Sequence, residues 1–184
     1  MLPYEDPGWR SSFRVLIPFV GLQLIQKHPR AQVETTRARF LVFVTAWLLF
    51  AWVLWFIELE ADDPLSDAVA AGIVIAVGMG SIVGALLLIP PLSCASPVAL
   101  VTSFHTRLFL RLLSAEVPVI VGFVLAFQVG SIWPYLLAAP FALVGFVRAA
   151  PTTGSFTRDV ADLQARPCAH AEDLWGLFEP SDAP

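Results

Sequence analysis

Charged residues are scarce in this sequence. Asp, Glu, Lys and Arg make up 14% of the 184 residues, whereas 57% are hydrophobic and the mean hydropathy is +0.73. Soluble globular domains carry about 25% charged residues, so this chain lacks the polar surface that a single soluble core needs. The net charge of −4 and the scattered arginines exclude a strongly basic surface for nucleic acid. The composition indicates a membrane protein.

Side chains that carry chemistry are equally rare, with two cysteines and three histidines. Cys94 and Cys168 form no CxxC pair, and the orientation argued below places both on the reducing side, so we expect free thiols. Cys168 and His170 supply at most two of the roughly four ligands of a metal site. No spacing brings Ser, His and Asp together as a catalytic set. The sequence predicts no enzyme, no metal site and no cofactor.

Four apolar runs predict an all-α, polytopic membrane protein with a four-transmembrane-helix bundle. About 20 helical residues cross the hydrocarbon core of a bilayer. Within a transmembrane domain of residues 40–148, the predicted spans are 40–57, 68–89, 107–128 and 134–148.

Short signals mark the ends of these spans. Ser66 or Asp67 is expected to cap the second span, because a short acceptor there satisfies free N–H groups. Gly130 and Ser131 predict a tight turn, and Pro134 suits the start of the fourth span.

The two ends of the chain are predicted to be cytoplasmic. Residues 1–39 include an amphipathic stretch at 13–26, which is too short to cross, and no secretory signal is indicated. This stretch either lies in the membrane interface or packs against the bundle. Residues 149–184 form a tail in which 157–164 favours a short helix. A cluster in the tail either docks a partner or folds back on the bundle, and it comprises Leu174, Trp175, Leu177 and Phe178.

The basic residues determine the predicted orientation. Four crossings place all ten arginines and the single lysine on one side, whereas the loop at 58–67 has five acids and no base. By the positive-inside rule both termini lie in the cytoplasm, and we expect a multi-pass protein of the bacterial inner membrane.

Small residues recur every four positions in two of the spans. Such ridges let another helix backbone approach closely, which indicates helix packing. The second span carries Gly72, Ala76, Gly80 and Gly84, and the third carries Ser114, Pro118, Gly122 and Ala126.

Glu116 is the only acidic residue inside any apolar run. At about 100° per residue it lies roughly 160° from Ser114 and Pro118, away from the small-residue ridge. Because an ionised acid is costly in hydrocarbon, two interpretations stay open. Glu116 is a protonatable or ion-binding carboxylate in a transport path, or it is paired with a partner subunit or with one of Arg107, Arg111 and Arg148.

The motif A-E-x-P-x-x-x-G at Ala115–Gly122, after the Gly-rich stretch Gly72–Gly84, resembles the hairpin of rotary ATPase proteolipid (c or K) subunits. The resemblance covers about residues 72–127. It implies that Glu116 carries a proton or sodium ion and that Gly72, Gly78, Gly80 and Gly84 pack the ring. More broadly, the chain resembles many four-helix bacterial inner-membrane proteins of uncharacterised function.

Two functions follow as hypotheses. The favoured one is a non-enzymatic accessory or assembly subunit of a larger membrane complex, in contact with lipid and with other membrane subunits or further copies of itself. The alternative is a proteolipid-like or small carrier protein that uses Glu116 to couple a proton or ion.

Overall fold

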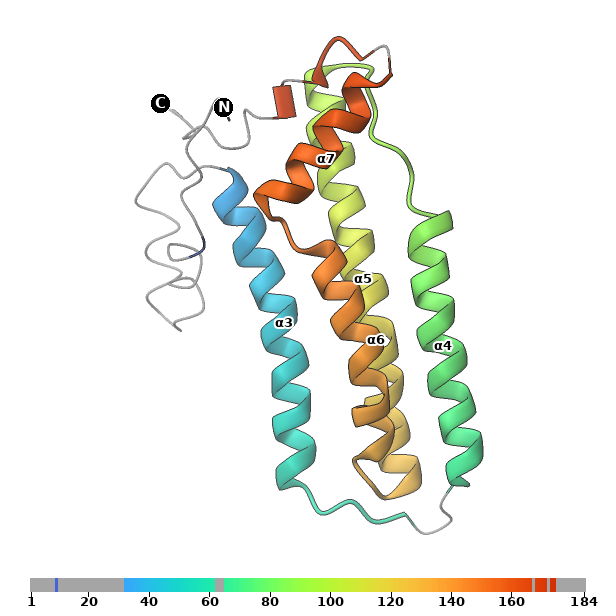
Figure 1. Cartoon of the computed structure of the whole chain (residues 1–184). Helices are drawn as coiled ribbons and strands as arrows, with labels where there is room; N and C mark the ends of the chain where they lie inside the picture. The colour runs from blue at the N-terminus through green and yellow to red at the C-terminus, as the bar shows by residue number, and fades with distance from the viewer. Residues whose placement is uncertain (1–8, 10–31, 62–64, 167, 172, 175–184) are drawn as a thin grey trace. The chain divides into compact units, whose positions relative to one another are not determined.

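The computed structural model describes residues 9, 32–61, 65–166, 168–171, 173 and 174. Five helices account for most of these residues, which confirms the all-α prediction (Figure 1). They are α3 (Gln32–Phe56), α4 (Asp67–Leu87), α5 (Pro97–Val129), α6 (Trp133–Ala149) and α7 (Thr153–Gln164). The amphipathic stretch at 13–26 lies outside the described residues.

Three helices are long and apolar enough to cross a membrane, namely α3 from Thr36, α4 and α5. The predicted fourth span, α6, has only 17 residues. It qualifies together with α7 as one span broken by a 62° bend. The protein therefore has three or four apolar helices able to span a membrane, and these imply contact with a lipid bilayer.

The helices extend beyond the predicted spans. α3 begins at Gln32 rather than at residue 40, and α5 begins at Pro97 rather than at 107. The segment between the second and third predicted spans is therefore helical from Pro97 onward. The local reason lies at the start of α5, where the Ser96 hydroxyl accepts a hydrogen bond from the Ala99 amide at 3.1 Å, and where proline suits the first turn of a helix.

The structure tests two short predictions, the cap of α4 and the turn after α5. Ser66 occupies the N-cap position, but its side chain makes no capping hydrogen bond. Asp67 instead accepts a hydrogen bond from the indole nitrogen of Trp133 at 3.1 Å. Gly130 has a φ of +71°, which other residues rarely adopt, and this confirms the predicted turn.

The chain divides into two compact units. Unit 1 comprises residues 1–42, 91–107 and 150–184, and unit 2 comprises residues 43–90 and 108–149. α3 and α5 each contribute to both units.

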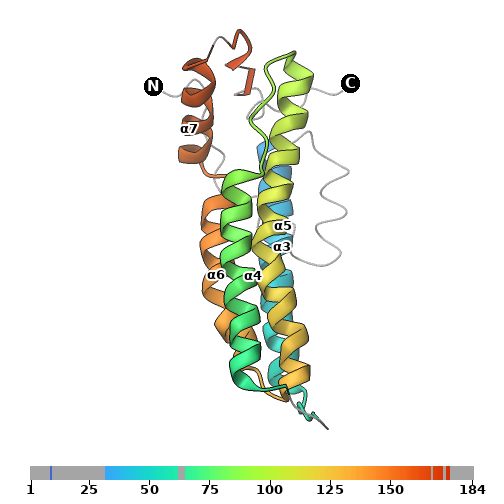
Figure 2. The same ribbon diagram turned by 90° about the vertical axis from the view of Figure 1, so that its right-hand side faces the viewer.

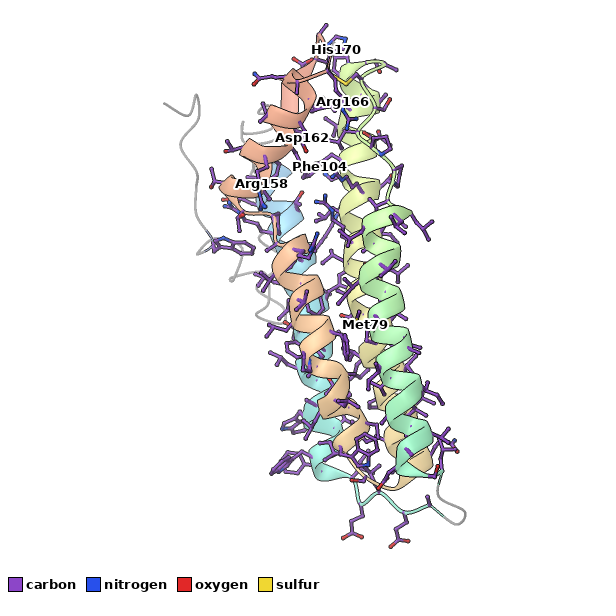
Figure 3. The ribbon with its side chains drawn as sticks, turned by 45° about the vertical axis from the view of Figure 1, so that its right-hand side comes forward. Met79, Phe104, Arg158, Asp162, Arg166 and His170 are labelled. Atoms are coloured by element: carbon purple, nitrogen blue, oxygen red, sulfur yellow. A yellow bond between two sulfur atoms is a disulfide. The ribbon has the colours of Figure 1, made fainter. Side chains whose placement is uncertain are left out.

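Unit 1 has its own hydrophobic core, in which the Phe104 and Phe156 rings stack at 5.0 Å. Figure 3 shows Phe104 on the side of α5 that faces α7. Arg107 pairs with Asp159 at 3.4 Å, and the fully buried Arg37 donates to the Pro151 carbonyl at 3.2 Å. The core consists of Val33, Leu92, Leu100, Phe104, Phe156, Val160, Leu163, Ala171 and Leu174.

A disulfide joins Cys94 to Cys168, with 5.5 Å between their Cα atoms (Figure 3). The prediction of two free thiols is wrong for this structure, in which the two sulfurs are bonded to each other. The cysteines are 74 residues apart in the chain, and both pack against the core of unit 1. Because tertiary packing alone brings them together, their spacing in the sequence gives no sign of the bond.

Unit 2 is a helix bundle (Figures 1 and 2). Its neighbouring helices meet through aromatic rings and glycines. Phe50 of α3 lies 4.9 Å from Phe123 of α5, and Gly78 of α4 faces the ring of Phe141 of α6. Between α5 and α6, a Cβ atom placed on Gly145 would lie 2.6 Å from the Cβ of Ala115. These two helices therefore approach as closely as their backbones allow.

We expect Gly145→Ala to destabilise unit 2, because the added methyl group overlaps Ala115 and overpacking costs about 1–3 kcal/mol. Thermal unfolding in detergent, followed by circular dichroism, measures the loss. Gly80→Ala is the matched control, since a Cβ there meets nothing within 4 Å. Equal stability of the two variants would contradict the close contact of α5 with α6.

Candidate functional site

Glu116 is buried inside unit 2, with 4% of its surface exposed. It shares the interior side of α5 with Ala115 and Val119, which are 3% and 0% exposed. The sequence placed Glu116 on a face away from close helix contact. In the structure, both the small-residue ridge and the face that carries Glu116 are buried, because α3 and α6 both pack against α5.

The carboxylate has an unsatisfied oxygen. Among the described residues Glu116 Oε1 is buried and has no hydrogen-bond partner. Arg107, one of the arginines considered for pairing, instead binds Asp159 in unit 1. An unpaired polar atom in a buried site is costly, and in a membrane span it is a default indication of function.

Tyr135 of α6 lies within electrostatic range of Glu116. Its side chain is 2% exposed, and its hydroxyl donates a hydrogen bond to the backbone carbonyl of Trp47 in α3. Trp47 also has a buried indole nitrogen with no hydrogen-bond partner in the part of the chain that the structure describes.

Tyr135 and Trp47 were not among the residues that the sequence singled out. One signal could have found Tyr135, since it is the only tyrosine besides Tyr4 and it lies within an apolar run. A buried tyrosine usually finds a hydrogen-bond partner. Trp47 gave no such signal, because six tryptophans are present and an indole near a membrane is ordinary.

The small-residue ridge of α4 makes no close contact within the described chain. A Cβ atom on Gly72 or Gly80 would meet nothing within 4 Å, and one on Gly84 would meet only Leu88, at 3.9 Å. The buried side of α4 instead carries Ala70, Val74 and Gly78. Gly72, Ala76 and Gly80 are exposed, so their packing role stays a prediction that concerns a partner.

The ridge of α5 lies mostly in the interior. Pro118, Gly122 and Ala126 are buried, and Ser114 is half-buried. A Cβ atom on Gly122 would lie 2.8 Å from the Cβ of Ala138 in α6. The Gly122 position and the Gly145 position are therefore two close contacts between α5 and α6.

Only one residue of the predicted docking cluster is described. Leu174 is fully buried in the core of unit 1. Trp175, Leu177 and Phe178 lie outside the described residues. Within residues 32–61, 65–166, 168–171, 173 and 174, no group of three His, Cys, Asp or Glu side chains could hold a metal ion.

Comparison with known protein families, with curated proteins and with solved structures gives no match to this chain.

We expect Tyr135→Phe to lower the free energy of unfolding by about 1 kcal/mol, because it removes the hydrogen bond to the Trp47 carbonyl from a buried site. Thermal unfolding in detergent measures the change. Thr157→Val is the control, since it removes an exposed hydroxyl hydrogen bond to the Thr153 carbonyl with little change of volume, and it should cost less. A larger loss for Thr157→Val would contradict the burial argument.

Proposed function

We propose that this chain is a non-enzymatic integral membrane protein that binds and releases a proton at Glu116, and that it couples this proton to a transport or conformational step. The observation that carries the proposal is the buried carboxylate oxygen without a hydrogen-bond partner among the described residues. Proton binding removes the charge that burial penalises, and it turns an unpaired acceptor into a donor.

The surroundings of Glu116 favour a proton over a metal cation. Hard cations such as Ca²⁺ take six to eight oxygen ligands, and Mg²⁺ needs near-octahedral coordination. No second acidic residue lies inside an apolar run of the sequence. A single carboxyl group binds a proton without further ligands, and the phenol of Tyr135 lies close enough to respond to the change of charge.

Infrared titration of the purified protein tests this proposal. A protonated carboxyl group in an apolar site gives a C=O stretching band that weakens when the proton leaves. We expect this pH-dependent band in the wild type and in Glu60→Gln, whose side chain is exposed, and we expect Glu116→Gln to lose it. Proton flux in proteoliposomes should fall with the same substitution.

An unchanged carboxyl band in Glu116→Gln would rule out the proton site. A lost band with unchanged flux would keep Glu116 as a proton-binding residue and remove it from the transport step. Both variants should first show the unfolding temperature of the wild type in the same detergent.

A second candidate function, an accessory or assembly subunit, is favoured by the uncovered ridge of α4. α4 is a candidate membrane span, and its exposed side combines Gly72 and Gly80 with large apolar side chains such as Ile75 and Met79. A helix of another membrane subunit, or of a second copy of this chain, can approach such a ridge closely.

We expect Gly80→Leu combined with Gly84→Leu to abolish association, because the new side chains hold the partner helix away while the chain's own bundle is untouched. Native mass spectrometry after gentle extraction measures what stays bound. Leu49→Phe adds bulk at an exposed position of α3 rather than α4 and is the control. Identical assemblies for the double variant and the wild type would remove this candidate function.

The proposed orientation places both termini in the cytoplasm of a bacterial inner membrane. Its support is the distribution of basic residues, since residues 58–66 and 130–132 carry no Lys or Arg.

A further inference from the structure

The Cys94–Cys168 disulfide closes unit 1 at one edge of its core. Cys94 lies in the connection that leads into α5, and Cys168 follows α7 (Figure 3). Both cysteines are half-buried and pack against the core of unit 1. The bond therefore links two segments that are otherwise held by non-covalent packing.

The charge of unit 1 conflicts with a permanent disulfide. Nine of the eleven basic residues belong to unit 1, six of them in residues 1–42, one in 91–107 and two in 150–184. The positive-inside rule assigns such segments to the cytoplasm. Cytoplasmic thiols are kept reduced, and disulfides found there are usually transient, catalytic or redox-sensing.

We propose that Cys94 and Cys168 form a reversible thiol–disulfide switch on the cytoplasmic side of the membrane. This proposal rests on the orientation proposed above and is independent of Glu116. The switch is closed in the structure and opens when the compartment is reducing.

The chemistry needs a low-molecular-weight disulfide as oxidant. The thiolate of one cysteine attacks a sulfur of that disulfide and releases one small thiol. The thiolate of the other cysteine then attacks the mixed disulfide, forms the Cys94–Cys168 bond and releases the second small thiol. Two protein thiols lose two protons and two electrons, and the oxidant gains them. A small dithiol reverses the exchange.

Non-covalent packing makes the closure repeatable. Leu92, two residues before Cys94, and Leu163 and Ala171, on either side of Cys168, all lie in the same hydrophobic core. These contacts do not depend on the sulfur bond, so they keep the reduced thiols near each other and ready to react again.

The switch controls the segment that follows α7. Leu174 is fully buried in the core of unit 1, and His170 pairs with Asp173 at 3.0 Å. Opening the bond removes a covalent restraint on residues 168–174, so this segment should separate from the core more often. Its buried leucine would then be available for contacts elsewhere.

Thiol trapping of the wild-type protein in living cells tests the switch. Cells are quenched with acid, and free thiols are alkylated with a maleimide that carries polyethylene glycol and shifts the protein on a non-reducing gel. We expect two additions per chain in growing cells, none after treatment with diamide, and two again after the oxidant is washed out. Cys94→Ser and Cys168→Ser should each take one addition in growing cells and none after diamide, because the mixed disulfide at the remaining cysteine has no second thiol to resolve it. Intact mass after diamide then separates these variants, which retain the small thiol, from the wild type, which does not, and Glu116→Gln should behave as the wild type.

Two outcomes would overturn the proposal. A wild-type protein without additions under every condition would hold a permanent structural disulfide. Two additions even after diamide would show cysteines that do not pair. A membrane-impermeant maleimide applied to intact cells tests the orientation separately, because labelling from outside would place unit 1 beyond the cytoplasm.

Hydrogen exchange of the purified full-length protein tests what the switch controls. We expect amides of residues 168–174 to exchange at least several-fold faster after reduction than before it, with α4 unchanged. Equal exchange in both states would show that the bond does not restrain this segment.

Discussion

Close approach of α5 and α6 is the constraint on which unit 2 depends. At Gly145 and Gly122 there is no room for even one methyl group, because Ala115 and Ala138 lie on the facing helix. In lipid, helices gain little from hydrophobic association, and van der Waals packing of small residues supplies much of the attraction. The two small-residue contacts therefore fix the distance between α5 and α6, and with it the surroundings of every side chain between them.

Glu116 lies beside one of these contacts, since its neighbour Ala115 faces Gly145. The tight packing leaves the carboxylate 4% exposed, with one oxygen unpaired among the described residues. Tyr135 occupies the facing helix, but its hydroxyl is committed to the carbonyl of Trp47. The same close approach that stabilises the bundle thus buries Glu116, and the proposed proton site rests on this burial.

Much of the fold could be predicted from local patterns in the sequence. The apolar runs predicted α3, α4 and α5, because a membrane span depends mainly on hydropathy. Gly130 predicted the turn, because the turn depends on one backbone conformation that glycine adopts readily. Helix starts at Gln32 and Pro97 were missed, because the length of an apolar run indicates only the part of a helix that fits a bilayer. The first turns of α3 and α5 are instead buried in the core of unit 1, through Val33, Leu100 and Phe104.

Tertiary placement could not be predicted from the same patterns. The glycines of α4 that recur every four residues suggested the packing face, yet the chain buries the neighbouring Ala70, Val74 and Gly78 instead. Likewise, Glu116 could be found as an acid in an apolar run, but not its burial near Tyr135. The Cys94–Cys168 bond depends on a core assembled from segments far apart in the chain. Periodicity in the sequence shows that a helix has a face of small residues, whereas contacts between helices determine which face is buried.

The 17 residues of α6 have a further consequence for the lipid around the protein. At about 1.5 Å per residue this helix is roughly 25 Å long, whereas the average hydrocarbon core is about 30 Å thick. If α6 crosses alone, the bilayer must thin around it or its flanking residues must reach toward the headgroups. α6 also carries Tyr135. The length of the lipid acyl chains would therefore affect how α6 packs beside the helix that carries Glu116. In that case a thinner bilayer would need less deformation around α6, whereas the 21 residues of α4 match the average thickness.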